Sequence, residues 1–150
     1  EFKIKSRDSF LRKIRDNYDP SGTEYEVKDI IRYTLTSPPD QLVDRAGQSI
    51  DAFSTNEYNT KGMKNYWLDP RSPYNGINST LTAPSGQGFE VQYHTAESYA
   101  LKNGRLHALY EKQRIIADTT SAEFIRLQNE MFELSGRLVV PDRIEELRIF

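Results

Sequence analysis

The switching between two hydrophobic periods is the feature that most limits the possible folds of this sequence. Short strand-like runs cover residues 2–6, 25–36, 61–69, 76–83 and 89–95. Helical spacing covers 6–18 and 39–53 and resumes after residue 95, where one apolar stripe predicts core packing: Phe124, Leu127, Met131, Leu134 and Leu138. Alternating polarity is typical of strands with one buried face, whereas spacing of three and four residues is typical of helices. The pattern predicts an α/β (α+β) fold, a mixed β-sheet flanked by helices.

The composition fits one domain and removes several classes of chemistry. The chain has 150 residues, of which 37% are hydrophobic, enough to form a single core over residues 1–150. It starts at Glu1 rather than Met, so we expect a domain of a longer protein. The absence of cysteine excludes disulfides, thiolate metal sites and a cysteine nucleophile. A net charge of −2 argues against a general polyanion binder. No apolar run approaches the roughly 20 residues of a membrane span, so no membrane partner is expected.

The sequence gives little support for a hydrolase triad or a zinc site. A Ser/His/Asp hydrolase lacks its Gly-x-Ser-x-Gly turn, and the chain has only His94 and His107 to offer. Two histidines alone make a weak case for zinc. Neither a Gly-x-Gly-x-x-Gly loop nor a Walker-type loop is present.

Two acidic residues occupy strand positions, where Asp and Glu are disfavoured. Asp29 lies in "KDIIRYT" and Glu90 in "FEVQYHT". Carboxylates on neighbouring strands can share one Mg²⁺, a hard ion that takes oxygen ligands together with water and substrate phosphates. Such a pair suits phosphoryl transfer. The alternative is that each residue is an edge-strand charge that discourages aggregation.

The strand that carries Glu90 has two unlike faces. Alternation places Phe89, Val91 and Tyr93 on one face, and it places three polar residues on the other: Glu90, Gln92 and His94. The apolar face is expected to pack on the core. The polar face is either solvated or lines a cleft, and alternation alone does not separate these possibilities.

A basic group near the start of the chain supplies the opposite charge. Lys3 and Lys5 project the same way from the first strand, and Ser9 and Lys13 lie one turn apart on the following helix. Such a group could hold a polyphosphate. A solvated basic face is the alternative.

One aromatic residue lies in a loop with strong turn chemistry. Tyr74 stands between Pro73 and Asn75-Gly76, next to a predicted strand. Its ring could stack on a nucleotide base. A packed turn tyrosine is the alternative.

Taken in order, these motifs resemble the synthetase domain of RelA/SpoT-type alarmone synthetases, which is nucleotidyltransferase-like. The segment "KIKSRDSFLRKI" is similar to the donor-phosphate motif of that family, with Lys3 in place of an arginine. "DIIRYT" resembles its metal-aspartate strand, and "KNYWLDPRSPYNGINST" resembles its Lys-Asp-Tyr and Gly-Tyr-x-Ser-x-His segment. "FEVQYHT" is similar to its Glu-x-Gln-x-Arg-Thr strand. The resemblance extends to about His107.

The resemblance implies an ATP-dependent nucleotide 3′-pyrophosphokinase with Mg²⁺ as its cofactor. It implies catalysis by Glu90, Asp29 and Gln92, with Asp29 and Glu90 as the metal ligands. The residues implied to bind the ATP donor are Lys3, Lys5, Ser9, Lys13 and Arg32. Those implied to bind the purine nucleotide acceptor are Lys64, Tyr74, Asn78, His94 and Tyr99.

Three positions depart from the family pattern and bear on the acceptor. Asn78 stands where the family usually has histidine, and His94 stands where many members have arginine. Tyr99 replaces an Asn or Asp that reads guanine, and a tyrosine cannot repeat that contact. Similar departures mark divergent toxin synthetases that make adenosine alarmones. The resemblance therefore implies an adenine acceptor, a (p)ppApp product and action in the bacterial cytoplasm, with delivery as a secreted effector and a cognate immunity protein as partner.

Three other functions stay open at this point. The chain could be a (p)ppGpp synthetase, or a catalytically inactive module that binds purine nucleotides. It could also transfer pyrophosphate to the 3′ end of tRNA, with RNA contacts from basic residues on the predicted helices: Lys102, Arg105, Lys112 and Arg114. An exposed helix face explains those four residues equally well.

Overall fold

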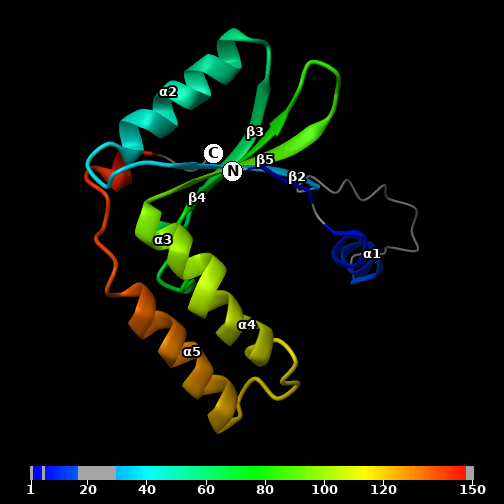
Figure 1. Cartoon of the computed structure of the whole chain (residues 1–150), viewed down its shortest axis with the longest axis vertical. Helices are drawn as coiled ribbons and strands as arrows, with labels where there is room; N and C mark the ends of the chain where they lie inside the picture. The colour runs from blue at the N-terminus through cyan, green and yellow to red at the C-terminus, as the bar shows by residue number, and fades with distance from the viewer. Residues whose placement is uncertain (1, 5, 17–29, 148–150) are drawn as a thin grey trace.

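The computed structural model describes residues 2–4, 6–16 and 30–147 and shows a mixed sheet with helices on both sides (Figure 1). The described residues form five strands: β1 (Phe2–Ile4), β2 (Ile31–Thr36), β3 (Asn59–Asn65), β4 (Ile77–Thr82) and β5 (Gly88–His94). Their order across the sheet is β1-β2-β5-β4-β3. Strands β2 and β5 run parallel, and the other neighbouring pairs run antiparallel. The predicted fold class is confirmed.

The helices lie in two groups that cover opposite faces of the sheet. In Figure 1, α2 lies on one side and α3, α4 and α5 lie on the other. The α-helices of the described chain are α1 (Arg7–Asp16), α2 (Leu42–Thr55), α3 (Ala96–Leu101), α4 (His107–Gln113) and α5 (Ala122–Ser135). A π-helical segment, η2 (Lys102–Leu106), links α3 to α4. Among the described helices, none has the length and apolar character needed to cross a membrane.

Side-chain caps fix where the helices begin after the strands. Ser6 Oγ accepts a hydrogen bond from the Ser9 amide at 3.4 Å and so caps the start of α1. Thr95 and Ser98 form a reciprocal capping box at the start of α3, with both bonds at 3.1 Å. Because Thr95 directly follows β5, this cap turns the chain at once and brings α3 back over the end of that strand.

One strand ends earlier than its sequence pattern predicts. The run 61–69 reads as a strand, but β3 stops at Asn65 and a 3₁₀ turn, η1 (Tyr66–Leu68), follows. The Asn65 side chain accepts a hydrogen bond from the Trp67 amide at 3.2 Å and donates one to the Ile144 carbonyl at 2.8 Å. A buried asparagine that bonds to nearby backbone competes with the ladder, so the strand ends there.

Two apolar clusters hold the layers together. The first lies between α2 and the sheet and joins Leu42, Val43 and Ala46 to apolar residues of β4 and β5: Ile77, Leu81, Phe89, Val91 and Tyr93. The second lies between α4 and α5 and contains Leu106, Leu109, Leu127 and Met131, with Leu134 packed against it. The predicted stripe is therefore confirmed as core packing at Leu127, Met131 and Leu134, whereas Leu138 lies beyond the end of α5.

Candidate active site

A row of polar side chains crosses the face of the sheet opposite α2. The register pairs Arg32 of β2 with Glu90 of β5, and it pairs Asn78 of β4 with Gln92. Gln92 is 3% exposed and His94 is fully buried. The alternative of a solvated edge is therefore wrong for this strand, because β5 lies between β2 and β4 and α3 follows it directly.

Glu90 lies at the centre of this polar face, held from two sides. Two guanidinium nitrogens of Arg32 each lie 3.5 Å from a Glu90 carboxylate oxygen. The Gln92 amide donates a hydrogen bond to the Glu90 Oε1 atom, and the Lys102 ammonium donates one to the Gln92 Oε1 atom. The four side chains form a line from a cation through a carboxylate and an amide to a second cation. These contacts orient the carboxylate while 13% of its side chain remains exposed.

The predicted acceptor residues Tyr74, Asn78 and His94 form one hydrogen-bonded cluster. The Tyr74 hydroxyl donates to Asn78 Oδ1 at 2.7 Å and lies 2.9 Å from His94 Nε2. His94 Nδ1 lies 2.9 Å from Ser98 Oγ. With the tyrosine proton directed to Asn78, His94 Nε2 donates to the tyrosine oxygen and Nδ1 accepts from Ser98. The loop tyrosine is thus anchored at its hydroxyl end, while its ring packs edge-on against Tyr66 with centroids 5.1 Å apart.

Burial holds this cluster in its neutral form. Burial lowers the pKa of His94 to about 3, and the positive charge of Lys102 acts in the same direction. Burial also raises the pKa of the Tyr74 hydroxyl, and the Glu90 carboxylate adds to that effect. The imidazole and the phenol are therefore both uncharged at neutral pH, so the cluster serves as a rigid hydrogen-bonded support.

Three α3 and η2 side chains face this polar row. Tyr99 lies with its ring centroid 5.8 Å from that of His94, and the Lys102 ammonium lies 5.6 Å from the Tyr99 centroid. The Tyr99 hydroxyl is buried and has no hydrogen-bond partner within the described part of the chain. No sequence motif points to Ser98, and Lys102 is predicted only as an RNA contact. The sequence does carry a signal that these two residues lie together, because Ser98 and Lys102 are four residues apart and share a helix face.

The predicted donor residues gather at the β1 side of the sheet as far as they are described. Lys3 stands opposite Arg32 in the β1–β2 ladder, and α1 carries Ser9 and Lys13 directly after β1. Ser9 Oγ accepts a hydrogen bond from Ser6 Oγ at 3.0 Å. Lys5 and Asp29 lie outside the described residues. The remaining predicted acceptor residue, Lys64, is exposed on β3 opposite Asn78.

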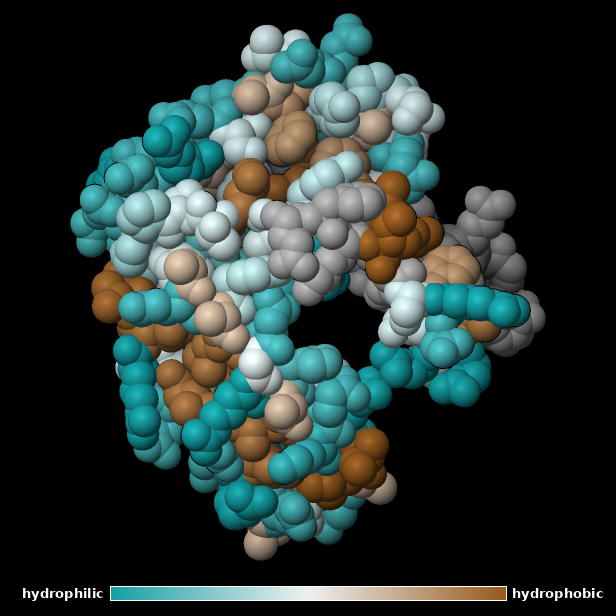
Figure 2. Space-filling view, in the orientation of Figure 1, coloured by the Kyte–Doolittle hydropathy of each residue, from teal (hydrophilic) through white to brown (hydrophobic). Residues whose placement is uncertain are grey.

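A cavity of about 410 Å³ opens beside this site. It lies between the loop 71–74 and the helices α4 and α5, with Tyr74 and Lys102 on the side toward the sheet and Tyr110 and Met131 on the far side. Figure 2 also shows an opening between α1 and α4, on the α3–α5 side of the sheet. Tyr74 thus contacts the polar face and also lines open space, as a residue that binds a substrate must.

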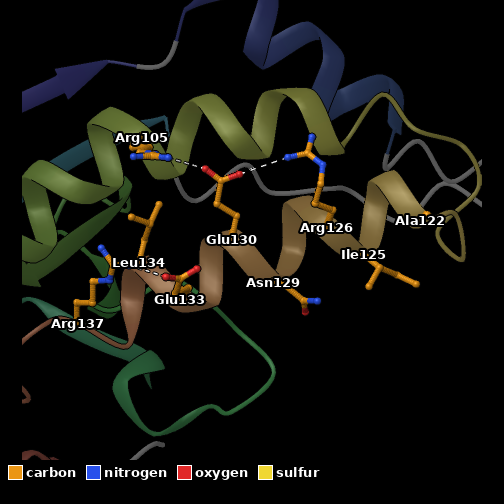
Figure 3. A pocket seen from close by; sticks show the side chains of 9 residues that line it. All are labelled: Arg105, Ala122, Ile125, Arg126, Asn129, Glu130, Glu133, Leu134 and Arg137. Carbon is orange, nitrogen blue, oxygen red and sulfur yellow. Dashed lines mark hydrogen bonds and ion pairs between the residues drawn. The ribbon is translucent and has the colours of Figure 1, made fainter.

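A larger hollow of about 790 Å³ lies elsewhere, along α5 (Figure 3). Its charged side chains are paired with one another. Glu130 lies between Arg105 at 2.8 Å and Arg126 at 3.6 Å, and Arg137 contacts Glu133 at 2.5 Å. None of the predicted site residues lines it. Surface ion pairs account for the charged side chains that line this hollow. The candidate active site therefore remains the one around Glu90.

The chemistry of the described residues is compatible with a hard cation. Across residues 2–4, 6–16 and 30–147, no group of three or more His, Asp or Glu side chains gathers into a complete metal site. Mg²⁺ usually takes one or two carboxylates and completes its shell with water and substrate phosphates. The partly exposed Glu90 carboxylate fits that requirement as one ligand.

Comparison with known proteins gives a result only at the level of structure. Neither a family model nor a curated protein matches the sequence. The small alarmone synthetase 2 from Bacillus subtilis superposes with a TM-score of 0.68 and 16% identity over 91% of this chain and 71% of that chain. The small alarmone synthetase 1 from Bacillus subtilis, bound to its product pppGpp, gives 0.62 and 19% over 99% and 76%.

A third structure is a Type VI effector rather than a small alarmone synthetase. The Type VI effector Tas1, in complex with its immunity protein, superposes with a TM-score of 0.63 and 22% identity over 91% of this chain and 80% of that chain. The chain therefore has the fold of the RelA/SpoT-type alarmone synthetase domain, as its motifs predicted.

Proposed function

We propose that this chain is an ATP-dependent pyrophosphokinase that transfers the β,γ-pyrophosphate of ATP to the 3′-hydroxyl of a purine nucleotide. The observation that carries the proposal is the Glu90 carboxylate, which the central strand of an alarmone-synthetase fold holds between Arg32 and Gln92. A carboxylate with a fixed orientation and an exposed oxygen suits a general base or a metal ligand.

In the proposed reaction, the acceptor 3′-oxygen forms a bond to the β-phosphorus of ATP. The bond between that phosphorus and the α,β-bridging oxygen breaks, and AMP leaves with the bonding electron pair. Glu90 accepts the proton of the 3′-hydroxyl. The products are AMP and a nucleotide with a 3′-pyrophosphate. Positioning and charge stabilisation dominate the rate of transfers at phosphorus, so the residues around Glu90 act mainly by orienting it.

We assign the ATP phosphates to the basic residues of the β1 side: Lys3, Lys5, Ser9, Lys13 and Arg32. The placement of Lys3 opposite Arg32 supports this assignment, because Arg32 contacts Glu90 directly. We assign Mg²⁺ to Glu90 and Asp29. A bound Mg²⁺ would supply neutralisation of the phosphate charge.

We assign the acceptor to the Tyr74 side of the site. The Tyr74 ring would stack on the base, supported by the anchoring of its hydroxyl through Asn78 and His94. Lys64 would contact the acceptor phosphates, and Tyr99 would lie near the base. We propose an adenine base, with (p)ppApp as product, because a tyrosine hydroxyl cannot supply the two acceptors that the N1–H and N2–H groups of guanine require.

We further propose that the protein acts as an antibacterial toxin in the bacterial cytoplasm and has a cognate immunity protein. The likeness in fold to the effector Tas1, whose structure is a complex with its immunity protein, supports this proposal. Such an enzyme would consume ATP as donor and adenine nucleotides as acceptor.

A single assay tests the reaction class. The chain is incubated with Mg²⁺, ATP labelled at the γ-phosphate and one acceptor at a time: AMP, ADP, GDP or tRNA. A 3′-pyrophosphorylated purine nucleotide, formed together with AMP and lost on addition of EDTA, is the expected result. Label on tRNA would replace the proposal with tRNA modification, and absence of product with every acceptor would leave a nucleotide-binding module. Growth arrest on expression in bacteria is the matching observation in cells.

A further inference from the structure

The Gln92 side chain is a buried amide whose two ends face opposite chemistry. Its NH₂ group donates to Glu90 Oε1, and its carbonyl oxygen accepts from the Lys102 ammonium. Gln92 is 3% exposed, so water has little access to substitute for either partner. The amide therefore depends on protein groups at both ends.

The direction of this amide is set by its neighbours. An ionised carboxylate only accepts hydrogen bonds and an ammonium only donates them. With Lys102 in place, the amide has one favourable orientation, with nitrogen toward Glu90 and oxygen toward Lys102. Without Lys102, the amide could rotate by half a turn and present its oxygen to Glu90, which would leave two acceptors facing each other.

Lys102 is itself held in place by the structure around it. It is the first residue of the π-helical segment η2, and π-helical turns are frequent at functional sites because they redirect side chains. Its ammonium lies 5.6 Å from the centroid of the Tyr99 ring, on the same helical face as Ser98. Lys102 therefore approaches Gln92 from a defined direction.

We propose that Lys102 is a positioning residue of the transfer reaction, which fixes the Gln92 amide so that its nitrogen holds the Glu90 carboxylate. The inference rests on the proposed pyrophosphokinase function for its kinetic consequence. It adds to the site a residue that no motif assigned. Lys102 acts through Gln92, and the reacting atoms need not touch it.

Three variants test the proposal kinetically. Lys102→Met keeps the length of the side chain but removes the donor, and we expect kcat to fall by about 10- to 100-fold while KM for ATP and for the acceptor stay within about two-fold. Lys102→Arg restores a cationic donor and should recover a large part of kcat. The matched control is Lys112→Met on α4, an exposed lysine away from Gln92, which should leave both constants unchanged.

A double variant separates positioning from direct action. In a Gln92→Leu background the amide is absent, so adding Lys102→Met should lower kcat by less than about two-fold. If the kcat losses of the two single variants multiply in the double variant, the proposal is overturned. A rise in acceptor KM with unchanged kcat in Lys102→Met would also overturn it, because Lys102 would then be a substrate contact. Unchanged kinetics of Lys102→Met would overturn it as well.

A spectroscopic readout keeps this inference distinct from the proposed function. The side-chain NH₂ protons of Gln92, assigned by NMR through Gln92→Leu, should exchange slowly with water in the parent chain and at least about ten-fold faster in Lys102→Met. If the parent chain transfers no pyrophosphate, the proposed function fails and this measurement still decides the role of Lys102. Equal exchange in both proteins would overturn the positioning role whatever the activity.

Discussion

At the scale of single residues, the position of Glu90 follows from register. The parallel pairing of β2 with β5 sets Arg32 beside Glu90, and the two-residue period of β5 sets Gln92 on the same face. A shift of β5 by one residue would turn Glu90 and Gln92 toward α2 and away from Arg32. The candidate catalytic side chains are thus positioned by the same hydrogen bonds that build the sheet.

Replacement of Glu90 tests the proposed chemistry most directly. Glu90→Gln keeps the shape of the side chain but removes the negative charge that would accept a proton or bind Mg²⁺. We expect kcat to fall by about 100- to 10,000-fold with little change in thermal stability. The matched control is Glu97→Gln, an exposed glutamate in the first turn of α3, which should retain full activity. Near-normal turnover of Glu90→Gln would contradict the mechanism.

His94 links stability to pH through its burial. Its pKa is lowered to about 3 in the folded protein, while an unfolded histidine titrates near about 6.5. Below that unfolded value the unfolded chain binds one proton more, so the folded state loses stability as the pH falls. We expect the free energy of unfolding to drop by up to about 1.4 kcal/mol per pH unit between about pH 6 and 4 on this account. Urea titrations across this range should show a shallower slope of unfolding free energy against pH for His94→Gln than for the parent chain.

Gly76 makes room for the Tyr74–His94 contact. A β-carbon at this position would lie 2.6 Å from the Tyr74 hydroxyl and 2.6 Å from His94 Cε1. Gly76→Ala should displace the tyrosine, cost about 1–3 kcal/mol of stability and raise KM for the acceptor more than KM for ATP. Gly47→Ala in α2, with no atom within 4 Å of the new carbon, should instead stabilise the protein by up to about 1 kcal/mol. Equal KM values in Gly76→Ala and the parent chain would argue against Tyr74 as the platform for the base.

At the scale of elements, α4 and α5 form a second packing unit. Leu127 is 1% exposed and packs with Leu106, Leu109 and Met131. Leu127→Ala should cost about 2–5 kcal/mol, measured by urea unfolding, because it removes a buried side chain and leaves a cavity. Ile125→Ala on the same helix removes a side chain that is 48% exposed and should cost less than about 1 kcal/mol. A similar loss from both variants would mean that the cluster does not carry the packing energy.

The sequence predicts the elements whose hydrophobic period is set by neighbouring residues. It does not predict features that depend on contacts between residues far apart in the chain. The strand 89–95 and the helix 39–53 follow from their apolar spacing, and the capping box at Thr95 adds a local signal. The end of β3 does not follow, since the Asn65 amide bonds to Ile144, far along the chain. Burial of the polar face of β5 also depends on sheet order, which alternation does not encode. The contact of Lys102 with Gln92 likewise depends on the fold, because it joins the π-helical segment η2 to β5.

At the scale of the whole molecule, α2 and α3 lie on opposite sides of the sheet (Figure 1). The face under α2 carries the first apolar cluster, and the other face carries the polar row around Glu90. The proposed donor residues that the structure describes lie on β1, α1 and β2, and the proposed acceptor residues lie on β3, β4, β5, α3 and the loop 71–74. Glu90 stands between these two sets on the central strand. Two substrates that approach from the β1 edge and the β3 edge of the sheet would therefore meet at this carboxylate, as a direct transfer requires.

The choice of acceptor base depends on how this arrangement ends at Tyr99. A carboxylate or amide oxygen at this position would accept hydrogen bonds from the N1–H and N2–H groups of guanine. A phenol offers one donor and no such pair of acceptors. Without those acceptors guanine would leave its N1–H and N2–H groups unpaired on binding, which disfavours it relative to adenine, whereas stacking on Tyr74 accepts either purine. In a competition between equal ADP and GDP, read by product mass, we expect ppApp to exceed ppGpp by at least about ten-fold. Tyr99→Asp should move the ratio toward ppGpp, since it restores two acceptor oxygens near the base. Mostly ppGpp from the parent chain would overturn the adenine assignment and leave the pyrophosphokinase proposal standing.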